Sequence, residues 1–268
     1  MSGNLRNQWI ESGHDAKRIL EAFATFPVFP LYLRYAVIDV DCRLFVDDLV
    51  SPESWMLFAP PAVLFHGKAM PDLIPSIRQH VLPGSWILSP SHEWDELLHK
   101  AFPEDLQSHP RMQFDAKNLD LEHIRHVRTP LPEGLMIEPI GPRHMDNDIM
   151  KHEVLDRFFQ KRAFPDYGFG FALTDCSGTL HGFALTNYPL DGGKEVEVSF
   201  RVGTNQDERY RRKGIATTLA SHFLEAAIVR GYVPQWDAAN EISAHIARKF
   251  GYTERLCWHM HHLVHPSE

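Results

Sequence analysis

Residues 195–217 read EVEVSFRVGTNQDERYRRKGIAT, and this stretch predicts the fold of the second half of the chain. From Glu195 to Val202, apolar side chains at even positions alternate with polar ones, which is typical of a strand with one buried face. A polar loop follows over residues 203–208. Apolar residues then recur at helical spacing from Ile215, and Gly231 ends the pattern. We therefore predict a strand, a basic turn that contains glycine, and a helix.

The turn before the predicted helix suits an anionic ligand. It carries four cations, at Arg209, Arg211, Arg212 and Lys213, in a chain whose formal net charge is -8. Gly214 and Ala216 are small enough for a phosphate to approach the backbone closely. The first N–H groups of a helix have no partner within it, and the positive end of the helix dipole lies there. An anion site and a solvated basic turn that caps an ordinary helix both fit this pattern.

Composition limits the class of protein. With 268 residues, 44% of them hydrophobic, the chain is long enough for two modest domains. We expect a cytoplasmic protein with no membrane partner, because no apolar run approaches the ~20 residues that span a bilayer, and the first residues lack the apolar core of a secretion signal. Three widely spaced cysteines imply no disulfide framework. The acidic balance argues against binding to nucleic acid.

The first half of the chain has a pattern like that of the second. Residues 1–25 predict a helical lead-in, and residues 62–114 predict the order strand, helix, strand, helix, strand that is also predicted from Glu195 onward. Residues 66–72, HGKAMPD, contain no counterpart of the basic turn. A degenerate copy of the second half and an unrelated α/β domain both remain open. Four prolines between residues 130 and 142 indicate a linker, so we predict domains over 1–130 and 131–268.

Two motifs carry a resemblance to a known family. Arg211-x-x-Gly214-x-Ala216, after a strand and at the start of a helix, resembles the acetyl-CoA pyrophosphate loop of the GNAT N-acetyltransferases. Residues 236–243, WDAANEIS, resemble the start of the helix that these enzymes place beside the pantetheine arm. The form Pro-x-Trp-Asp-x-x-Asn over 234–240 is similar to the zwittermicin A resistance-type GNAT subfamily. The resemblance covers about residues 168–254, and the first half matches only loosely.

The resemblance implies an α/β (α+β) fold, with a mixed central sheet flanked by helices and a smaller α/β domain before it. It implies acetyl-CoA as co-substrate, no metal, and acetyl transfer to the amine of a small molecule by direct attack in a ternary complex. A protein or peptide N-acetyltransferase and a non-catalytic acyl-CoA-binding module are the alternatives, and a homodimer is also open. The implied cofactor-binding residues are Val202, Thr204, Arg209, Arg211, Arg212, Lys213, Gly214, Ile215, Ala216, Thr217, Asn240 and Ser243.

The proton transfers of such a reaction need a base and, in many family members, an acid. Glu197 lies mid-strand on the polar side and is our first candidate for the base, with Glu195 on the same face as the second. The alternative is a solvated face of ordinary surface charges. Many GNAT members carry a tyrosine acid four residues before the glycine that ends the helix, where this chain has Ala247. Ser243, Tyr252 or a water molecule are the remaining candidates.

A histidine-rich segment near the end of the chain is a separate feature. Cys257, His259 and His261 alternate, which places three potential metal ligands on one face of a strand. No second ligand pair at suitable spacing is found elsewhere in the sequence. We therefore expect an exposed or packing-satisfied histidine cluster here, and no metal site.

Overall fold

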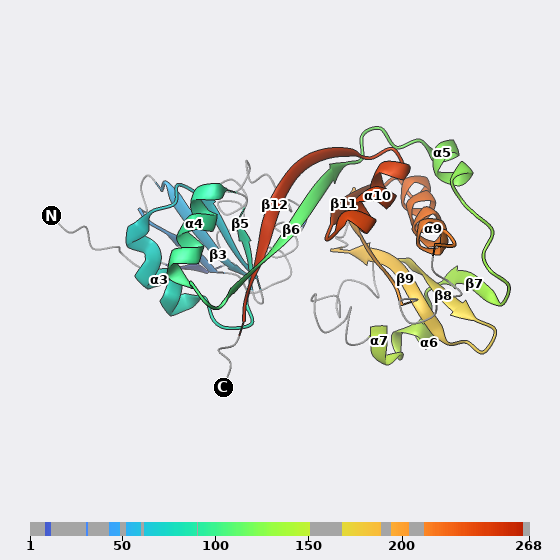
Figure 1. Ribbon diagram of the computed structural model, residues 1–268, viewed down its shortest axis with the longest axis horizontal. Helices are drawn as coiled ribbons and strands as arrows, with labels where there is room; N and C mark the ends of the chain where they lie inside the picture. The colour runs from blue at the N-terminus through green and yellow to red at the C-terminus, as the bar shows by residue number, and fades with distance from the viewer. Residues whose placement is uncertain are drawn as a thin grey trace. The chain divides into compact units, whose positions relative to one another are not determined.

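The computed structural model describes residues 9–11, 31, 43–48, 52–59, 62–89, 91–150, 168–188, 194–203 and 212–264. By compactness the chain divides into two units, one formed by Met1–Met112 with Leu256–Glu268 and the other by Gln113–Arg255. Each unit contains strands of a mixed sheet with helices packed on them (Figure 1). The domain division that the sequence predicts, at residue 130, stays a prediction.

The first unit is built on strands in the spatial order β1-β2-β3-β4-β5-β12. Their bounds are β1 Trp9–Glu11, β2 Arg43–Val46, β3 Ser54–Ala59, β4 Ala62–Gly67, β5 Trp86–Ser89 and β12 Thr253–Leu263. The strands β4 and β5 are parallel, and the other neighbouring pairs of this order are antiparallel. The connecting helices are η1 Pro71–Leu73, α3 Ile74–His80 and α4 His92–Ala101.

The alternation predicted for residues 62–114 is confirmed, since β4, α3, β5, α4 and β6 (Leu106–Asp115) follow one another. The helical lead-in is wrong for Trp9–Glu11, which form a strand. These residues pair antiparallel with β2, from Trp9 opposite Phe45 to Glu11 opposite Arg43, so ladder hydrogen bonds with the sheet edge override a weak local preference. The rest of residues 1–25 lies outside the described residues.

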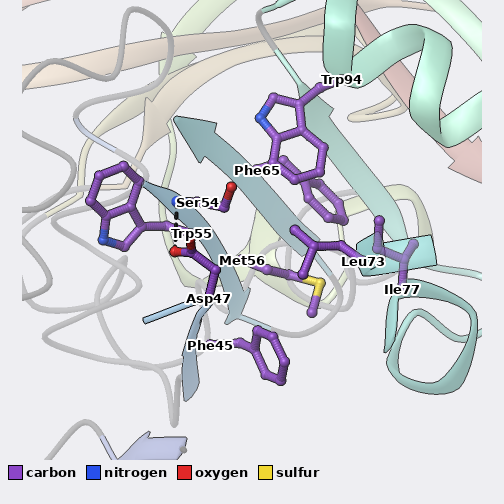
Figure 2. A pocket seen from close by; sticks show the side chains of 9 residues that line it. All are labelled: Phe45, Asp47, Ser54, Trp55, Met56, Phe65, Leu73, Ile77 and Trp94. Atoms are coloured by element: carbon purple, nitrogen blue, oxygen red, sulfur yellow. Dashed lines mark hydrogen bonds between the residues drawn. The ribbon is translucent and has the colours of Figure 1, made fainter. Parts of the chain in front are cut away.

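The core of the first unit packs large side chains from the sheet against α3 and α4. Phe65, Ile77 and Trp94 are each almost fully buried in it. Figure 2 shows the nine side chains that surround a cavity in this region. The cavity has a volume of about 10 Å³. That space fits about one water molecule, so the cavity is too small for a larger ligand.

The turn after β4 is closed by hydrogen bonds from its own unit. Gly67 has φ +77°, and its carbonyl oxygen accepts a 2.9 Å hydrogen bond from Nε1 of Trp94. The backbone N–H of Lys68 donates to the carbonyl of Glu53 at 2.8 Å, and the hydroxyl of Ser54 donates to the carbonyl of Lys68. These backbone groups are therefore satisfied internally, as expected for a turn that lacks the basic anion-binding pattern.

The second unit follows the order β6-β11-β10-β9-β8-β7. Its strands are β7 Leu135–Pro139, β8 Gly170–Asp175, β9 Leu180–Asn187, β10 Glu195–Val202 and β11 Val233–Ala238, with the end of β6. Its helices are α5 Leu121–His126, α6 Pro142–Met145, α7 Asp148–Met150, α9 Ile215–Val229 and α10 Glu241–Lys249. The neighbours β7 to β10 are antiparallel, and β10 and β11 are parallel. The predicted sequence of strand, helix, strand and helix from Glu195 onward is confirmed.

Helices cover both faces of this sheet. On one face, the ring of Phe171 in β8 lies 5.8 Å from that of His222 in α9. On the other face, Met150 of α7 is buried in a cluster with Ala172 and Phe183. Because successive residues of a strand point to opposite faces, Phe171 and Ala172 mark the α9 face and the α7 face respectively.

Two strands belong to both units. The strand β6 begins in the first unit and ends in the second, where β11 is its neighbour, whereas β12 begins in the second unit and ends in the first, where it pairs with β5. The closing strand predicted for the first half thus completes the sheet of the second unit, and the closing strand of the second half completes the sheet of the first.

Gly67 provides a test of the closed turn. A Cβ at this position would lie 2.1 Å from the carbonyl oxygen of Glu53 and 2.5 Å from the ring of Trp55. We expect Gly67→Ala to lower the free energy of unfolding by about 3 kcal/mol or more, from left-handed strain plus overpacking. Gly178 has φ +84° and no atom within 4 Å of the place that a Cβ would take, so Gly178→Ala is the control for strain alone and costs about 1 kcal/mol. Urea unfolding measures both, and equal losses would contradict the steric argument.

Candidate functional site

The start of α9 is a helix terminus without a side-chain cap, and positively charged side chains lie next to it. The helix begins at Ile215, as the sequence predicts, and its N-cap residue Gly214 has φ 73° and provides no side-chain cap. Arg212 also has a positive φ, 59°, so the backbone turns sharply into the helix. Arg212 and Lys213 are both exposed. Among the described residues, the first N–H groups of the helix thus have no side-chain cap, and the helix dipole and two cations lie at the same place, which fits the phosphate groups of a nucleotide ligand.

A residue that the sequence did not single out holds this turn in place. Thr129 lies against Gly214, where a Cβ would come within 2.5 Å of the threonine Oγ1. The backbone N–H of Thr129 donates to Oγ1 of Thr218 at 3.1 Å, and the Thr129 hydroxyl donates to the carbonyl of Lys213 at 3.4 Å. Thr129 follows the helices of the predicted first domain and has no motif of its own, so only the three-dimensional structure places it here.

The segment before Thr129 is fixed to α9 by an arginine and a carboxylate. Nε of Arg128 donates to Oγ of Ser221 at 2.8 Å, and the same guanidinium forms an ion pair with Glu225. Arg125 adds a second ion pair to Glu225 at 2.9 Å. Burial raises the pKa of Glu225, but the hydrogen bonds from Arg128 and Arg125 outweigh that effect and leave the pKa of this carboxyl below its usual value. The segment therefore stays attached while Glu225 is ionised.

The parallel strands β10 and β11 separate beside this helix start. Their pairing runs from Glu195 opposite Val233 to Glu197 opposite Gln235, whereas β10 continues to Val202 and β11 to Ala238. Within the described residues, the later parts of the two strands are thus not paired with each other. Backbone N–H and C=O groups along this edge can pair with an extended ligand, since each needs a partner.

Glu197 lies where the two strands begin to separate. It is only 9% exposed, and its neighbours across the sheet are Asn187 on β9 and Gln235 on β11. The register places it on the face of Leu185 and Phe183, which is the α7 face of the sheet. The alternative of a fully solvated polar face is therefore wrong for Glu197. Glu195 shares this face, and its Oε1 accepts a 3.1 Å hydrogen bond from Nε2 of Gln235.

A second buried polar group on this face was also missed from the sequence. Gln113 at the end of β6 is 6% exposed, and its Oε1 has no hydrogen-bond partner among the described residues. The next residue, Phe114, packs with Tyr252 and Arg248 on the α10 side, so the side chain of Gln113 points to the opposite face. A buried acceptor without a partner is costly, which indicates that a donor from a ligand or water reaches it.

The two predicted residues at the start of α10 are held by their own surroundings. Oδ1 of Asn240 accepts the backbone N–H of Ser243 at 2.9 Å, so Asn240 is the N-cap of α10. Oγ of Ser243 accepts from Nε1 of Trp236 at 3.1 Å. Trp236 is buried and packs on Phe200, with ring centroids 5.1 Å apart across the separation of β10 and β11. Their contacts with a cofactor stay predictions.

Tyr252 is a poor candidate for the general acid. Its hydroxyl is buried and donates to the carbonyl of Pro234 at 2.7 Å. Burial raises the pKa of Tyr252 well above its usual value, so the phenol gives up its proton less readily. Ala247, in the position of the usual tyrosine, is fully buried.

The remaining predicted residues divide into three groups. Arg212, Lys213, Gly214, Ile215, Ala216 and Thr217 lie together at the start of α9, and Val202 ends β10. Thr204, Arg209 and Arg211 lie outside the described residues.

In the described part of the chain no group of three His, Cys, Asp or Glu side chains is arranged to hold a metal ion, and no helix there is long and apolar enough to cross a membrane. Cys257 is exposed, whereas His261 is buried.

An uncapped basic helix start beside two separating parallel strands is the arrangement expected of an acyltransferase that binds coenzyme A. A family profile described as GNAT acetyltransferase matches residues 32–260. The chain therefore belongs to the GNAT acetyltransferase family, whose members generally use acetyl-CoA. The match includes most of the first half of the chain, which the sequence motifs alone connected only loosely.

Comparisons with individual proteins agree with this assignment. The chain is 23% identical over 240 residues to the uncharacterized N-acetyltransferase YdfB of Bacillus subtilis (strain 168), covering 81% of this chain and 85% of that protein. A GCN5-related N-acetyltransferase-like protein from Streptococcus suis has a TM-score of 0.72 at 19% identity, over 94% of this chain and 99% of that one. A tandem GNAT protein from the clavulanic acid biosynthesis pathway has a TM-score of 0.60 at 11% identity, over 97% and 99%. The predicted GNAT fold is confirmed.

The packing of Thr129 against Gly214 predicts a specific coupling. We expect Gly214→Ala to destabilise the protein by about 2–3 kcal/mol, from left-handed strain and the collision with Thr129. Thr129→Ala leaves only the Cβ of residue 129, at 3.5 Å from the new methyl group. In that background the same glycine substitution costs only about 1 kcal/mol. Urea unfolding of the four proteins measures the cycle, and strictly additive costs would show that the contact does not exist.

Proposed function

We propose that this protein is an N-acetyltransferase that transfers the acetyl group of acetyl-CoA to the amine of a small molecule by direct attack in a ternary complex. The observation that carries the proposal is the uncapped, basic start of α9 next to the separation of β10 and β11. The helix start provides donors for phosphate, and the separated strands provide backbone groups for an extended thioester arm. Membership of an acyltransferase family supports the same activity.

In this proposal the residues at the start of α9 bind the pyrophosphate of acetyl-CoA. The backbone N–H groups of Ile215, Ala216 and Thr217 donate to it, and Arg212 and Lys213 add charge. The small side chain of Ala216 leaves room for this approach. The open edge of β10 as far as Val202 holds the pantetheine arm, and Ser243 lies across the separation beside Trp236. Arg209, Arg211 and Thr204 extend the same site by resemblance to the family.

Glu197 is the proposed general base. The acceptor must attack as a neutral amine, and the C–N bond forms while the C–S bond of the thioester breaks. Glu197 accepts the amine proton directly or through a water molecule. A backbone N–H group of β10 stabilises the oxyanion that develops on the carbonyl. The position of Glu197 supports this role, because the residue lies where β10 and β11 begin to separate and is almost entirely withdrawn from bulk solvent.

Gln113 is a proposed contact for the acceptor. Its buried Oε1 lies on the face of the sheet that also carries Glu197, and it is satisfied when the acceptor donates an N–H or O–H group to it. Small amines that carry further hydrogen-bond donors, such as amino sugars or amino-acid derivatives, have this property. The likeness to zwittermicin A resistance-type enzymes agrees with a small-molecule acceptor, but subfamily likeness does not determine a substrate.

The proposed function is tested first by binding of acetyl-CoA and then by amine-dependent release of the thiol. We expect micromolar binding by calorimetry, and Lys213→Gln to weaken it about tenfold through loss of one charge-assisted contact. Lys249→Gln removes a charge from the exposed far end of α10 and is the matched control, with unchanged affinity. Binding without thiol release for any amine in a broad panel, including peptides, would favour an acyl-CoA-binding module. No binding would refute the site.

The two glutamates of β10 are distinguished by their pH–rate profiles. We expect Glu197→Gln to lower kcat at neutral pH by about 10²–10⁴-fold, as for loss of a general base. The deficit becomes smaller at alkaline pH, where more of the amine is already neutral. Glu195→Gln leaves kcat within about threefold, because its partner Gln235 can also bond to an amide. A Glu197→Gln profile parallel to that of the wild type at every pH would remove Glu197 as the base.

A further inference from the structure

Four side chains of the first unit form a hydrogen-bonded line that the acetyl-transfer site does not use. Nε2 of His261 lies 2.8 Å from Oδ1 of Asp95, and Nδ1 of the same ring lies 2.9 Å from Oγ of Ser108. Oγ of Ser108 is also 3.2 Å from Nε2 of His99. Asp95 and His99 belong to α4, His261 to β12 and Ser108 to β6. A carboxylate, an imidazole and a hydroxyl therefore stand in sequence.

The surroundings of each group differ in a way that suits proton transfer. The side chain of His261 is 1% exposed and that of Asp95 is 18% exposed, whereas Ser108 is exposed to solvent. His261 lies opposite the buried Ile87 of β5, on the face of the sheet that α4 covers. The imidazole is thus held inside the unit, and the hydroxyl at the end of the line is accessible to a molecule from outside.

The charge state of Asp95 fixes the positions of the protons. Burial raises the pKa of Asp95, but hydrogen bonds from His261 and His259 outweigh this and leave the pKa of the carboxyl below its usual value. An ionised carboxylate only accepts hydrogen bonds, so Nε2 of His261 carries a proton. In the neutral ring Nδ1 is then an acceptor, and the hydroxyl of Ser108 donates to it. His99 in turn donates from Nε2 to Oγ of Ser108.

We propose that Ser108 is a nucleophile activated by His261 and Asp95, and that this surface of the first unit reacts with esters of small acyl groups. His261 is the general base, and Asp95 is a positioning residue that holds the ring in the reactive tautomer. This relay uses the two ring nitrogens in opposite roles, which is the requirement for a serine nucleophile. In this proposal His261, which belongs to the histidine-rich segment noted in the sequence, acts as a general base and not as a metal ligand.

The proposed reaction balances within the groups named. Oγ of Ser108 attacks the ester carbonyl, the Oγ–C bond forms, and Nδ1 of His261 takes the hydroxyl proton. The bond from the carbonyl carbon to the leaving oxygen then breaks, and the alcohol or phenol leaves with the proton from His261. Water hydrolyses the acyl-serine by the same transfers in reverse.

The proposed reaction is independent of acetyl transfer, because all four residues belong to the first unit, whereas α9 and β10 belong to the second. The same network also connects α4 to the sheet, which is an ordinary structural role. Chemical reactivity of Ser108 distinguishes the two roles, since a merely structural hydroxyl is not acylated faster than any other exposed serine.

The experiment treats the full chain with a fluorophosphonate probe and maps the modified peptide by mass spectrometry. We expect stoichiometric modification at Ser108, and its absence in Ser108→Ala. Ser177 is the matched control: it is exposed, but its Oγ bonds the carboxylate of Asp175 at 2.6 Å instead of an imidazole. Ser177→Ala therefore leaves the labelling unchanged. Hydrolysis of 4-nitrophenyl acetate should show the same dependence on Ser108.

The role of Asp95 is tested by Asp95→Asn, which keeps the shape of the side chain but no longer fixes the tautomer of His261. We expect labelling and ester hydrolysis to slow by about 10²–10⁴-fold, while circular dichroism and the mobility on gel filtration stay those of the wild type. Absence of labelling at Ser108 in the wild type, or labelling of folded Asp95→Asn at the wild-type rate, would overturn the proposal.

Discussion

The left-handed backbone at Gly214 is the constraint on which the proposed acetyl-CoA site depends. With φ 73° and no side chain, this residue turns the chain into α9 and leaves the helix start without a cap, so its N–H groups remain available. Thr129 occupies the space in which a Cβ would lie, and Arg128 fixes that threonine segment to the helix. The position of the proposed anion site thus depends on packing from a distant part of the sequence as well as on the basic turn.

The two halves of the chain share the order strand, turn and helix, but the turn after β4 differs from the turn before α9. In the first unit the turn after β4 also uses a glycine with positive φ, but Trp94, Glu53 and Ser54 satisfy its polar backbone groups within the unit. The adjacent cavity has room for about one water molecule. The same order of strand, turn and helix therefore occurs in both halves. In the first half the polar backbone groups of the turn are bonded within the unit, whereas in the second half the N–H groups at the helix start have no side-chain cap. A degenerate copy of the second half is compatible with this contrast, and it stays a prediction.

Local patterns predicted the elements whose causes are local. The alternation of β10, the start of α9 after Gly214 and the helix start within residues 236–243 each depend on residues a few positions apart, and the structure has all three. Thr129, Gln113 and the pairing of Asp95 with His261 depend on contacts between distant segments, for which one sequence has no signal. The exchange of β6 and β12 between the units belongs to the same class, because strand order is set by tertiary pairing.

The fate of the thiolate follows from the same geometry. The hydroxyl of Tyr252 donates its hydrogen bond to the carbonyl of Pro234 in β11, and burial raises the pKa of this phenol. Tyr252 is therefore a poor proton donor for a leaving group. Oγ of Ser243 accepts a hydrogen bond from Trp236, so the O–H group of Ser243 can still donate to another acceptor beside the separated strands. A thiol has a pKa of about 8.5, so its thiolate is a tolerable leaving group near neutral pH. In the proposed mechanism the main demand therefore falls on removing the amine proton, which is the role proposed for Glu197, and not on protonating the thiolate.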